Sequence, residues 1–504
     1  MDSAEVLVVG AGPTGLALAC GLRLHGVRVR VIEQASGPAT TSRANILHAR
    51  GVEVLDRLGA VGDLEQQAID ALQLTMYVGE RPLTTMRFRE VKGARVSALY
   101  VSQADVEAQL RRRLADLGVH VEWNAALMDV AADAHGVTAT LGNGRAVRAG
   151  WLVGCDGAHS TVRRLSGARF PGVPVVEQFL LADVHADWDR DRSGGAGWFH
   201  RDGILLAIPM RESGGAGDLW RLMANVPRTD AELDDQAIID QFGRLLLVRA
   251  GVRDARIRDA TWTSVFRIHR RLADVYRCGR ILLAGDAAHI HSPIGGQGMT
   301  TGIGDAENLA WKLALVVGGL ADQPLLDTYQ AERRPLAADV LRNTTANTRL
   351  LVGAGPVTRL LRDRLFLPLL NLPSVQRRGT ASASQLWVSY RRGPLGGPRF
   401  GRRPRPGVRV PDRTCERADG SCTRLHDELD GRWALLVPRS GATDSVAAAR
   451  KRLGDHVVTL TVPDNKASEV WLVRPDAHMA WRGRRDPAAL GRWLDNALQH
   501  GRAT

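Results

Sequence analysis

The chain opens with apolar runs separated by short breaks. Residues 5–9 are mostly apolar and β-branched, which is typical of a strand buried in a parallel sheet. Glycines follow within residues 10–15, and the apolar residues 16–24 then predict a helix. A second apolar run, 27–32, ends at the acidic Glu33. This order of strand, glycine turn, helix and strand predicts a βαβ unit.

Further along the chain, apolar and polar positions alternate over longer stretches. Residues 104–118 predict an amphipathic helix, and residues 119–153 alternate as strands do around a glycine turn at 142–144. Residues 175–265 contain more strand-like runs and predict a sheet that covers the ligand of the first unit. Residues 280–284 then return to the pattern of a buried strand.

Together these patterns predict an α/β protein built from several units. The first expected unit is a Rossmann-type dinucleotide-binding domain at 1–174, which also carries substrate-domain strands near 72–100. An inserted and mainly antiparallel β-sheet domain for the substrate follows at 175–265, and the first domain then continues with long helices at 266–392. A linker rich in Gly, Pro and Arg at 393–413 leads to a compact strand-and-helix domain at 414–504.

The net charge of +13 changes this picture little. Only four lysines occur, so nearly all the positive charge is arginine, and the arginines are scattered through amphipathic segments. Such a bias is typical of a GC-rich genome. We therefore expect no nucleic-acid binding, and only a general attraction for anionic cofactors.

The cysteines and the N-terminal region indicate a cytoplasmic protein. The five cysteines form no metal-ligand spacing and no C-x-x-C pair, so we expect reduced thiols and no metal site. Asp2 and Glu5 do not suit a signal peptide, and the glycines at 10–15 would break a membrane-spanning helix. We expect no membrane span.

The first glycine motif carries the clearest chemistry. Gly10 permits a tight turn, Gly12 lets a phosphate approach the backbone, and Gly15 lets the following helix pack closely on the strand. The N-terminus of that helix then faces a pyrophosphate. Glu33 lies about 20 residues further on, where a carboxylate accepts hydrogen bonds from a ribose diol.

Two further motifs follow predicted strands. Asp156 begins an Asp-Gly turn that leads to Arg163, which we expect to brace the loop or meet a phosphate; an ordinary helix cap by Asp156 explains the same residues. Asp286 follows Gly285, and a glycine-rich loop at 292–302 then opens a long helix. Backbone N–H groups at such a helix start stabilise negative charge.

In this order, the three motifs resemble those of the single-component (class A) aromatic hydroxylases, the flavoprotein monooxygenases related to para-hydroxybenzoate hydroxylase. Residues 431–437 and 470–482 resemble the thioredoxin-like C-terminal domain of the polyketide and phenol hydroxylases in that superfamily. The resemblance covers essentially the whole chain. It implies an FAD-binding domain, an inserted substrate domain and a thioredoxin-like domain without a redox role, because no C-x-x-C pair accompanies it.

The resemblance also implies which residues hold non-covalent FAD. These are Gly10, Gly12, Thr14, Gly15, Glu33, Gln34, Arg43, Gln103, Leu127, Asp156, Asp286, Pro293, Gly298 and Met299, with the Pro293 loop beside the flavin ring. Thr300 departs from the family pattern, which usually has Asn there, and this puts the detailed flavin contact in doubt.

The activity implied is that of an FAD-dependent monooxygenase. NADPH or NADH reduces the flavin as a transient co-substrate, O₂ adds to give a flavin C4a-hydroperoxide, and one oxygen atom hydroxylates a phenol-like or polyketide-like aromatic ring. Baeyer–Villiger insertion and antibiotic-inactivating oxygenation on the same fold stay open, as does a non-catalytic flavoprotein that binds an aromatic ligand. A homodimer is compatible with the sequence.

Residues for the substrate are harder to identify. Five large side chains on the expected sheet could form a flat aromatic pocket, although core packing explains each equally well: Trp198, Phe199, Met210, Trp220 and Met223. His200, His269 and His291 are candidates for a base that deprotonates a phenol, and a solvated or core histidine explains each of them better.

Overall fold

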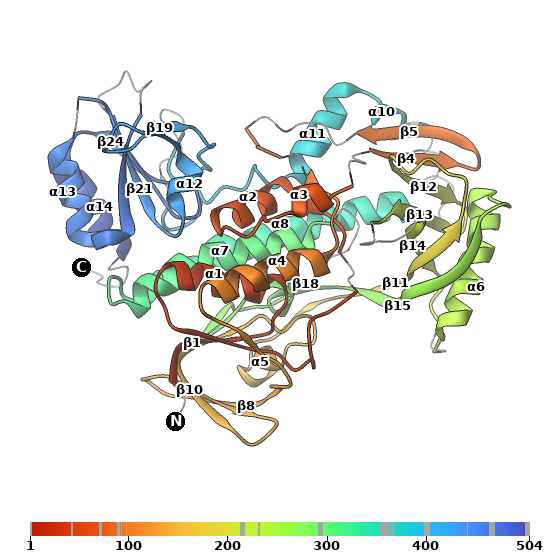
Figure 1. The fold of residues 1–504 in the computed structure, drawn as a ribbon, viewed down its shortest axis with the longest axis horizontal. Coiled ribbons are helices and arrows are strands. Elements are labelled where there is room, and N and C mark those ends of the chain that lie inside the picture. Colours follow the sequence, from red (N-terminus) through yellow and green to blue (C-terminus); the bar gives the residue numbers. More distant parts are fainter. Residues whose placement is uncertain are drawn as a thin grey trace.

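Three β-sheets, with the helices that cover them, make up the protein (Figure 1). The computed structural model describes residues 3–41, 44–69, 73–87, 91, 93–96, 98–211, 217–229, 232–290, 296–352, 361, 364, 367–397, 404–440, 442–462 and 469–498. The chain forms the first sheet, then the second, returns to the first, and ends in the third.

The first sheet has a parallel centre in the order β17-β10-β1-β2-β7, with β16, β8 and β9 added antiparallel at its borders. Its strands are β1 (Ser3–Val9), β2 (Val29–Ile32), β7 (Val121–Glu122), β8 (Leu127–Ala132), β9 (Val137–Leu141), β10 (Ala146–Gly154), β16 (Arg277–Cys278) and β17 (Ile281–Leu283). The apolar run of β1 is almost entirely buried, as expected for a central parallel strand.

Helices cover this sheet, and the longest of them cross the middle of the molecule (Figure 1). They are α1 (Pro13–Leu24), α2 (Ala49–Arg57), α3 (Leu64–Gln67), α4 (Gln103–Asp116), α5 (Thr161–Leu165), α7 (Gly298–Val317) and α8 (Asp327–Val352), with short 3₁₀ turns η2 (Gly285–Ala287) and η3 (Gln323–Leu326). A two-stranded pair, β3 (Leu47–His48) and β6 (Ala98–Leu99), adjoins α2. Helix α1 packs on both α4 and α7.

The second sheet is mainly antiparallel, in the order β18-β15-β11-β14-β13-β12-β4-β5. Its strands are β4 (Gln73–Val78), β5 (Arg81–Arg87), β11 (Gly172–Asp187), β12 (Gly195–His200), β13 (Gly203–Pro209), β14 (Leu219–Val226), β15 (Arg256–Leu272) and β18 (His289–Ile290). Helix α6 (Asp235–Leu245) and the π-helical turn η1 (Leu246–Ala250) pack on one face, and α10 (Leu367–Leu369) and α11 (Pro373–Ala383) lie near β5 (Figure 1).

The third sheet, coloured blue in Figure 1, belongs to the C-terminal domain and has the order β20-β19-β22-β21-β23-β24. Its elements are β19 (Thr414–Glu416), β20 (Cys422–Arg424), α12 (Leu425–Leu429), β21 (Trp433–Val437), α13 (Thr443–Leu453), η5 (Gly454–His456), β22 (Val457–Thr461), β23 (Glu469–Val473), β24 (Met479–Arg484) and α14 (Pro487–Leu498). A parallel β21–α13–β22 unit beside two antiparallel strands gives the expected thioredoxin-like arrangement.

Two details differ from the sequence-based expectation. Strand β15 continues to Leu272, so the second sheet extends past residue 265 into the stretch assigned to the first domain. The described parts of the expected linker are packed rather than open, because Leu395 and Val410 are buried in two different apolar cores. Apolar residues within a Gly, Pro and Arg-rich stretch explain the second difference.

Candidate flavin site

The glycine motif after β1 needs glycine at two positions for steric reasons. Gly10 has a φ of +105°, and a Cβ added to it would lie 2.5 Å from the carbonyl oxygen of Cys155. A Cβ on Gly15 would lie only 2.0 Å from the carbonyl oxygen of Gly10. At Gly12 a Cβ would meet no described heavy atom within 4 Å. Gly12 therefore borders open space at the start of α1.

The three sequence motifs meet around Thr14. A Cβ added to Gly285 or to Gly302 would lie 2.5 or 2.3 Å from the Thr14 hydroxyl oxygen. The second motif joins them through its backbone, because the N–H of Cys155 donates to the carbonyl of Val9 at 2.8 Å. Segments far apart in the sequence therefore converge at the carboxyl ends of β1, β10 and β17, the edge where parallel sheets bind ligands.

The helix starts at this edge fit an anionic, dinucleotide-like ligand. Among the described residues, no side chain caps α1 at Gly12 or α7 at Gln297, and neither first turn contains an acidic residue. Each helix thus presents N–H groups and the positive end of its dipole. Two such helix ends beside a glycine with no near neighbour suit a pyrophosphate and a second electron-rich group.

Glu33 is held in the position expected of a ribose-binding carboxylate. Its two carboxylate oxygens accept hydrogen bonds from the N–H groups of Ala11 at 2.8 Å and Ala35 at 3.1 Å. The neighbouring Gln103 donates its amide to Glu107 at 2.9 Å. Burial raises the pKa of Glu107, and the negative charge of nearby Glu33 raises it further. Glu33 therefore lies close to the start of α4.

Asp156 and Arg163 have structural partners of their own. The carboxylate of Asp156 accepts hydrogen bonds from the Ser160 hydroxyl at 2.5 Å and from the N–H groups that begin α5 at 2.7 and 3.0 Å. This is the helix cap weighed for it above. Arg163 braces two loops, because its guanidinium donates to the carbonyls of Ala158 at 2.9 Å and Ala287 at 2.8 Å.

Asp286 lies in η2 with an exposed side chain, and the loop around it is fixed by a residue that sequence reasoning missed. Asp305 is fully buried on α7 and accepts a hydrogen bond from the N–H of Gly285 at 3.1 Å. It also pairs with Arg333 and His289, each at 2.6 Å. Burial by itself raises the pKa of Asp305, but these two partners lower it to about 2, so it is ionised at neutral pH.

The other predicted cofactor residues lie on several elements. Gly298 and Met299 begin α7, the exposed Gln34 follows Glu33, and Leu127 begins β8 with its side chain in the core. The hydroxyl of Thr300 accepts a hydrogen bond from the N–H of His48 at 3.2 Å. The side chain of Thr300 is therefore engaged with the β3 segment. Arg43 and Pro293 lie outside the described residues.

The second sheet separates the five predicted substrate residues. Trp198 and Trp220 lie in the apolar core beneath α6, whereas Phe199 and Met223 lie in a cluster on the opposite face. Met210 follows β13, where its carbonyl accepts from Arg192 at 2.8 Å. One pocket therefore cannot contain all five. The expectation missed this because both faces of these strands are apolar, so alternation does not show which side each residue occupies.

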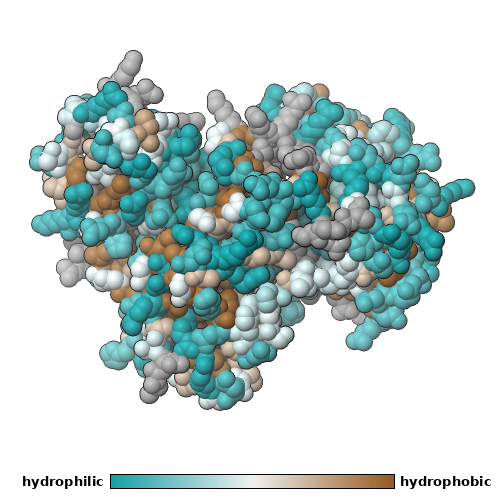
Figure 2. Space-filling model, in the orientation of Figure 1, coloured by the Kyte–Doolittle hydropathy of each residue, from teal (hydrophilic) through white to brown (hydrophobic). Residues whose placement is uncertain are grey.

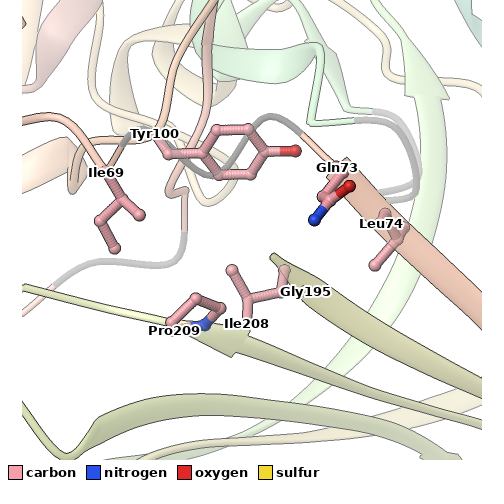
Figure 3. Close-up of a pocket in the computed structure, with 7 residues that line it drawn as sticks. All are labelled: Ile69, Gln73, Leu74, Tyr100, Gly195, Ile208 and Pro209. Carbon is pink, nitrogen blue, oxygen red and sulfur yellow. The ribbon is translucent and has the colours of Figure 1, made fainter. Parts of the chain in front are cut away.

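A pocket opens on the same face as Phe199 and Met223, between β4, β12, β13 and the segment around Tyr100 (Figure 3). Its lining is largely apolar, with the Gln73 amide and the Tyr100 hydroxyl as polar groups: Ile69, Gln73, Leu74, Tyr100, Gly195, Ile208 and Pro209. Burial raises the pKa of Tyr100 well above its usual range. Its hydroxyl is therefore protonated at neutral pH.

No histidine is among the described residues that line this pocket. His200 lies at the β12–β13 turn, where its Nδ1 accepts from the N–H of Asp202 at 3.3 Å. The side chain of His269 and the whole of His291 lie outside the described residues.

The surface gives no sign of an apolar belt on the face shown in Figure 2, where hydrophilic residues dominate and apolar ones form small groups. Among the described helices, none combines the length and the hydropathy needed to cross a bilayer.

Comparison with known proteins identifies the family. Residues 3–344 match the FAD binding domain family, and residues 403–499 match the aromatic-ring hydroxylase C-terminal family. The chain is 35% identical over 490 residues to rifampicin monooxygenase from Streptomyces venezuelae, covering 97% of both chains. It is also 32% identical over 508 residues to dialkyldecalin synthase from Streptomyces rugosporus, covering 98% of this chain and 100% of that one.

Among solved structures, the anhydrotetracycline hydroxylase OxyS from Streptomyces rimosus matches with a TM-score of 0.81 and 33% identity, over 99% of this chain and 100% of that chain. The resemblance, the fold class and the FAD cofactor predicted from the sequence are thereby confirmed. This chain belongs to the FAD-binding aromatic-ring hydroxylase family: it is an FAD-dependent monooxygenase, and NADPH or NADH is the co-substrate typical of that family.

Proposed function

We propose that this enzyme hydroxylates a bulky polycyclic phenol of the polyketide class, with one edge of the ring system at the pocket beside Tyr100. The pocket carries the proposal: it is largely apolar, it lies on the second sheet, and it offers a protonated hydroxyl and an amide. The pocket is small, so it suits one oxygen-bearing edge of an aromatic ligand rather than a whole ring system. Relatives named for rifampicin and anhydrotetracycline support a large substrate.

We place non-covalent FAD along the edge where the glycine motifs converge. Gly12 and the first turn of α1 would hold the pyrophosphate, Glu33 the adenosine ribose, and Asp286 the ribityl chain. The first turn of α7 would stabilise negative charge on the reduced ring. When bound, FAD supplies the redox chemistry by which NAD(P)H and O₂ deliver one oxygen atom to the substrate.

The protein's own contribution is then positioning and the exclusion of water. The apolar lining of the pocket keeps bulk solvent from the substrate face. The Tyr100 hydroxyl, protonated because burial raises its pKa, can donate a hydrogen bond to a substrate oxygen and so fix which ring carbon faces the flavin.

Isotope labelling tests this function. Purified enzyme with FAD, NADPH and polycyclic phenols under ¹⁸O₂ is expected to add one heavy oxygen atom to the product and return the other as water. The dialkyldecalin synthase relative makes a cyclisation the second candidate, and that reaction would give a product of unchanged oxygen content. Label entering from H₂¹⁸O, or turnover without O₂, would exclude monooxygenation.

Two substitutions test the FAD placement. Glu33→Ala removes the partner of the Ala11 N–H and should weaken FAD binding by about 1–3 kcal/mol, roughly 5- to 150-fold in Kd. Asp286→Ala should also lose flavin while keeping the fold, because this side chain is exposed. Titration of apoprotein with FAD, monitored by flavin fluorescence, measures both, and circular dichroism checks the fold. Wild-type affinity in both variants would show the placement to be wrong.

A further inference from the structure

A tight turn of the C-terminal domain, residues 474–478 between β23 and β24, enters the first domain. The N–H of Ala477 donates to the carbonyl of Arg474 at 2.9 Å, and Ala477 has a φ of +57°. Arg474, Asp476 and His478 are all completely buried, although each is polar or charged. A turn of this composition must satisfy its polar groups against the domain it enters.

Those partners come from α2, α7 and α8, and the one from α2 is Arg50, which donates to the carbonyl of Asp476 at 2.8 Å. The guanidinium of Arg474 donates to both oxygens of Glu332 at 2.7 and 2.9 Å. Lys312 donates to Glu332 at 2.7 Å, and Asp476 accepts from Asn308 at 3.3 Å. Buried ion pairs of this kind add little net stability, and breaking one is strongly destabilising. Their best-supported use is to specify one geometry.

Arg333, which follows Glu332 on α8, faces the flavin-binding loops, by which we mean the loop that carries Asp286 and the first turn of α7. Arg333 donates through Nε to Asp305 at 2.6 Å and through Nη2 to the carbonyl of Thr301 at 2.8 Å. Asp305 in turn accepts from the N–H of Gly285. One guanidinium therefore fixes both the loop that carries Asp286 and the first turn of α7.

Tyr390 links the turn to this guanidinium directly. Its hydroxyl accepts a hydrogen bond from Nη1 of Arg333 at 3.0 Å. Its ring lies 4.3 Å, centroid to centroid, from the ring of His478 and 5.0 Å from the guanidinium carbon of Arg474. The turn thus contacts Arg333 through Tyr390 and contacts α8 through Glu332.

We propose that the turn at 474–478 positions the flavin-binding loops, with Tyr390 and Arg333 as the positioning residues through which it acts. This gives the thioredoxin-like domain a role that needs no redox cysteines. The inference rests on the placement of FAD proposed above. Loosening the turn lowers the fraction of apoprotein whose loops are ready to bind FAD, and the apparent affinity falls by the same factor.

The experiment uses full-length protein with Tyr390→Phe as the main variant. This change removes one acceptor from Arg333 and keeps the ring against His478. Arg474→Lys keeps the charge of the turn but loses the two-pronged contact with Glu332. Arg452→Lys is the matched control, because Arg452 makes the same two-pronged contact, with Asp495 at 2.6 and 2.7 Å, inside the C-terminal domain and away from the turn.

We expect Tyr390→Phe and Arg474→Lys to raise the Kd for FAD about 3- to 10-fold, to shift the visible absorbance of the bound flavin, and to make its reduction potential more negative. Arg452→Lys should leave the Kd for FAD, the flavin absorbance and the potential unchanged. Asp286→Ala, run alongside, tests the placement itself.

Three outcomes would overturn the proposal. Wild-type Kd, absorbance and potential in Tyr390→Phe and Arg474→Lys, with Asp286→Ala impaired, would refute the positioning role and leave the FAD placement intact. Equal flavin changes in Arg452→Lys would show general loosening of the domain. Unchanged FAD binding in Asp286→Ala would remove the placement and the inference together.

Discussion

Gly15→Ala is expected to prevent stable folding, whereas Gly12→Ala, three residues earlier, is expected to leave the fold intact and weaken FAD binding strongly. The Cβ of an alanine at 15 would lie 2.0 Å from the carbonyl oxygen of Gly10, and that atom is backbone. Neither side can give way without moving α1 off β1. We expect a loss of about 3 kcal/mol or more in the free energy of unfolding.

Gly12 has the opposite surroundings. A Cβ there meets no described heavy atom within 4 Å, and its φ of −75° suits alanine. Alanine is a poorer N-cap than glycine, which destabilises the folded protein, but it also makes the unfolded chain less flexible, which stabilises the fold. Because the two effects nearly cancel, the free energy of unfolding should change by less than about 1 kcal/mol. The added methyl would occupy the space through which the pyrophosphate approaches the backbone. FAD binding should weaken by about 100-fold or more.

Denaturant unfolding of the apoproteins and FAD titration measure the two effects separately. Gly243→Ala is the control, because Gly243 is exposed on α6 and also has no described neighbour within 4 Å. It should leave FAD binding unchanged and raise the free energy of unfolding by about 0.5–1 kcal/mol, because alanine favours the helix more than glycine does. A Gly12→Ala protein that binds FAD as tightly as the wild type would contradict the pyrophosphate position.

The glycine motifs could be read from the sequence because their constraints are local. Each glycine acts on the turn or helix next to it, so the order of strand, turn and helix indicates a dinucleotide site. The family resemblance then identifies the dinucleotide as FAD. The buried pairing of Asp305 with Arg333 gave no such signal. Its partners lie 28 residues apart on two helices, and a charge in an amphipathic helix ordinarily indicates a solvated face.

The faces of the second sheet were hidden for a related reason. Trp198 and Phe199 are adjacent, both are 2% exposed, and they point to opposite sides. Only the register of β12 with β13 and β4 decides which of them faces α6 and which faces the pocket side. A sheet covered on both faces leaves no polar stripe from which that register can be deduced.

Acid should weaken the contact between the C-terminal domain and α2, because the ring of buried His426 can hold no second proton there. Arg57 can only donate, so its Nη1, 3.3 Å from Nδ1 of His426, requires that nitrogen to be an acceptor. The other ring nitrogen, Nε2, donates to the carbonyl of Val410 at 3.0 Å. The neutral form of the histidine is thus built into the contact.

Burial lowers the pKa of His426 well below 6.5, and the charge of Arg57 lowers it further. Below pH 6.5 the unfolded chain therefore takes up a proton that the folded chain refuses. This contribution to stability is complete above pH 6.5 and is lost as the pH falls. Each pH unit costs up to about 1.4 kcal/mol, or roughly 2 kcal/mol between pH 6.5 and 4.5, because the unfolded histidine is already half protonated at pH 6.5.

His426→Gln tests this, since glutamine can still donate and accept at this site but does not titrate in that range. Urea unfolding at pH 7.5, 6.5, 5.5 and 4.5 should give the variant a shallower loss of stability toward acid, even if it is less stable at pH 7.5. The exposed His159→Gln should keep the wild-type slope. A His426→Gln protein with the wild-type slope would show that this contact does not govern acid sensitivity, because a side chain that cannot take up the proton would then have made no difference.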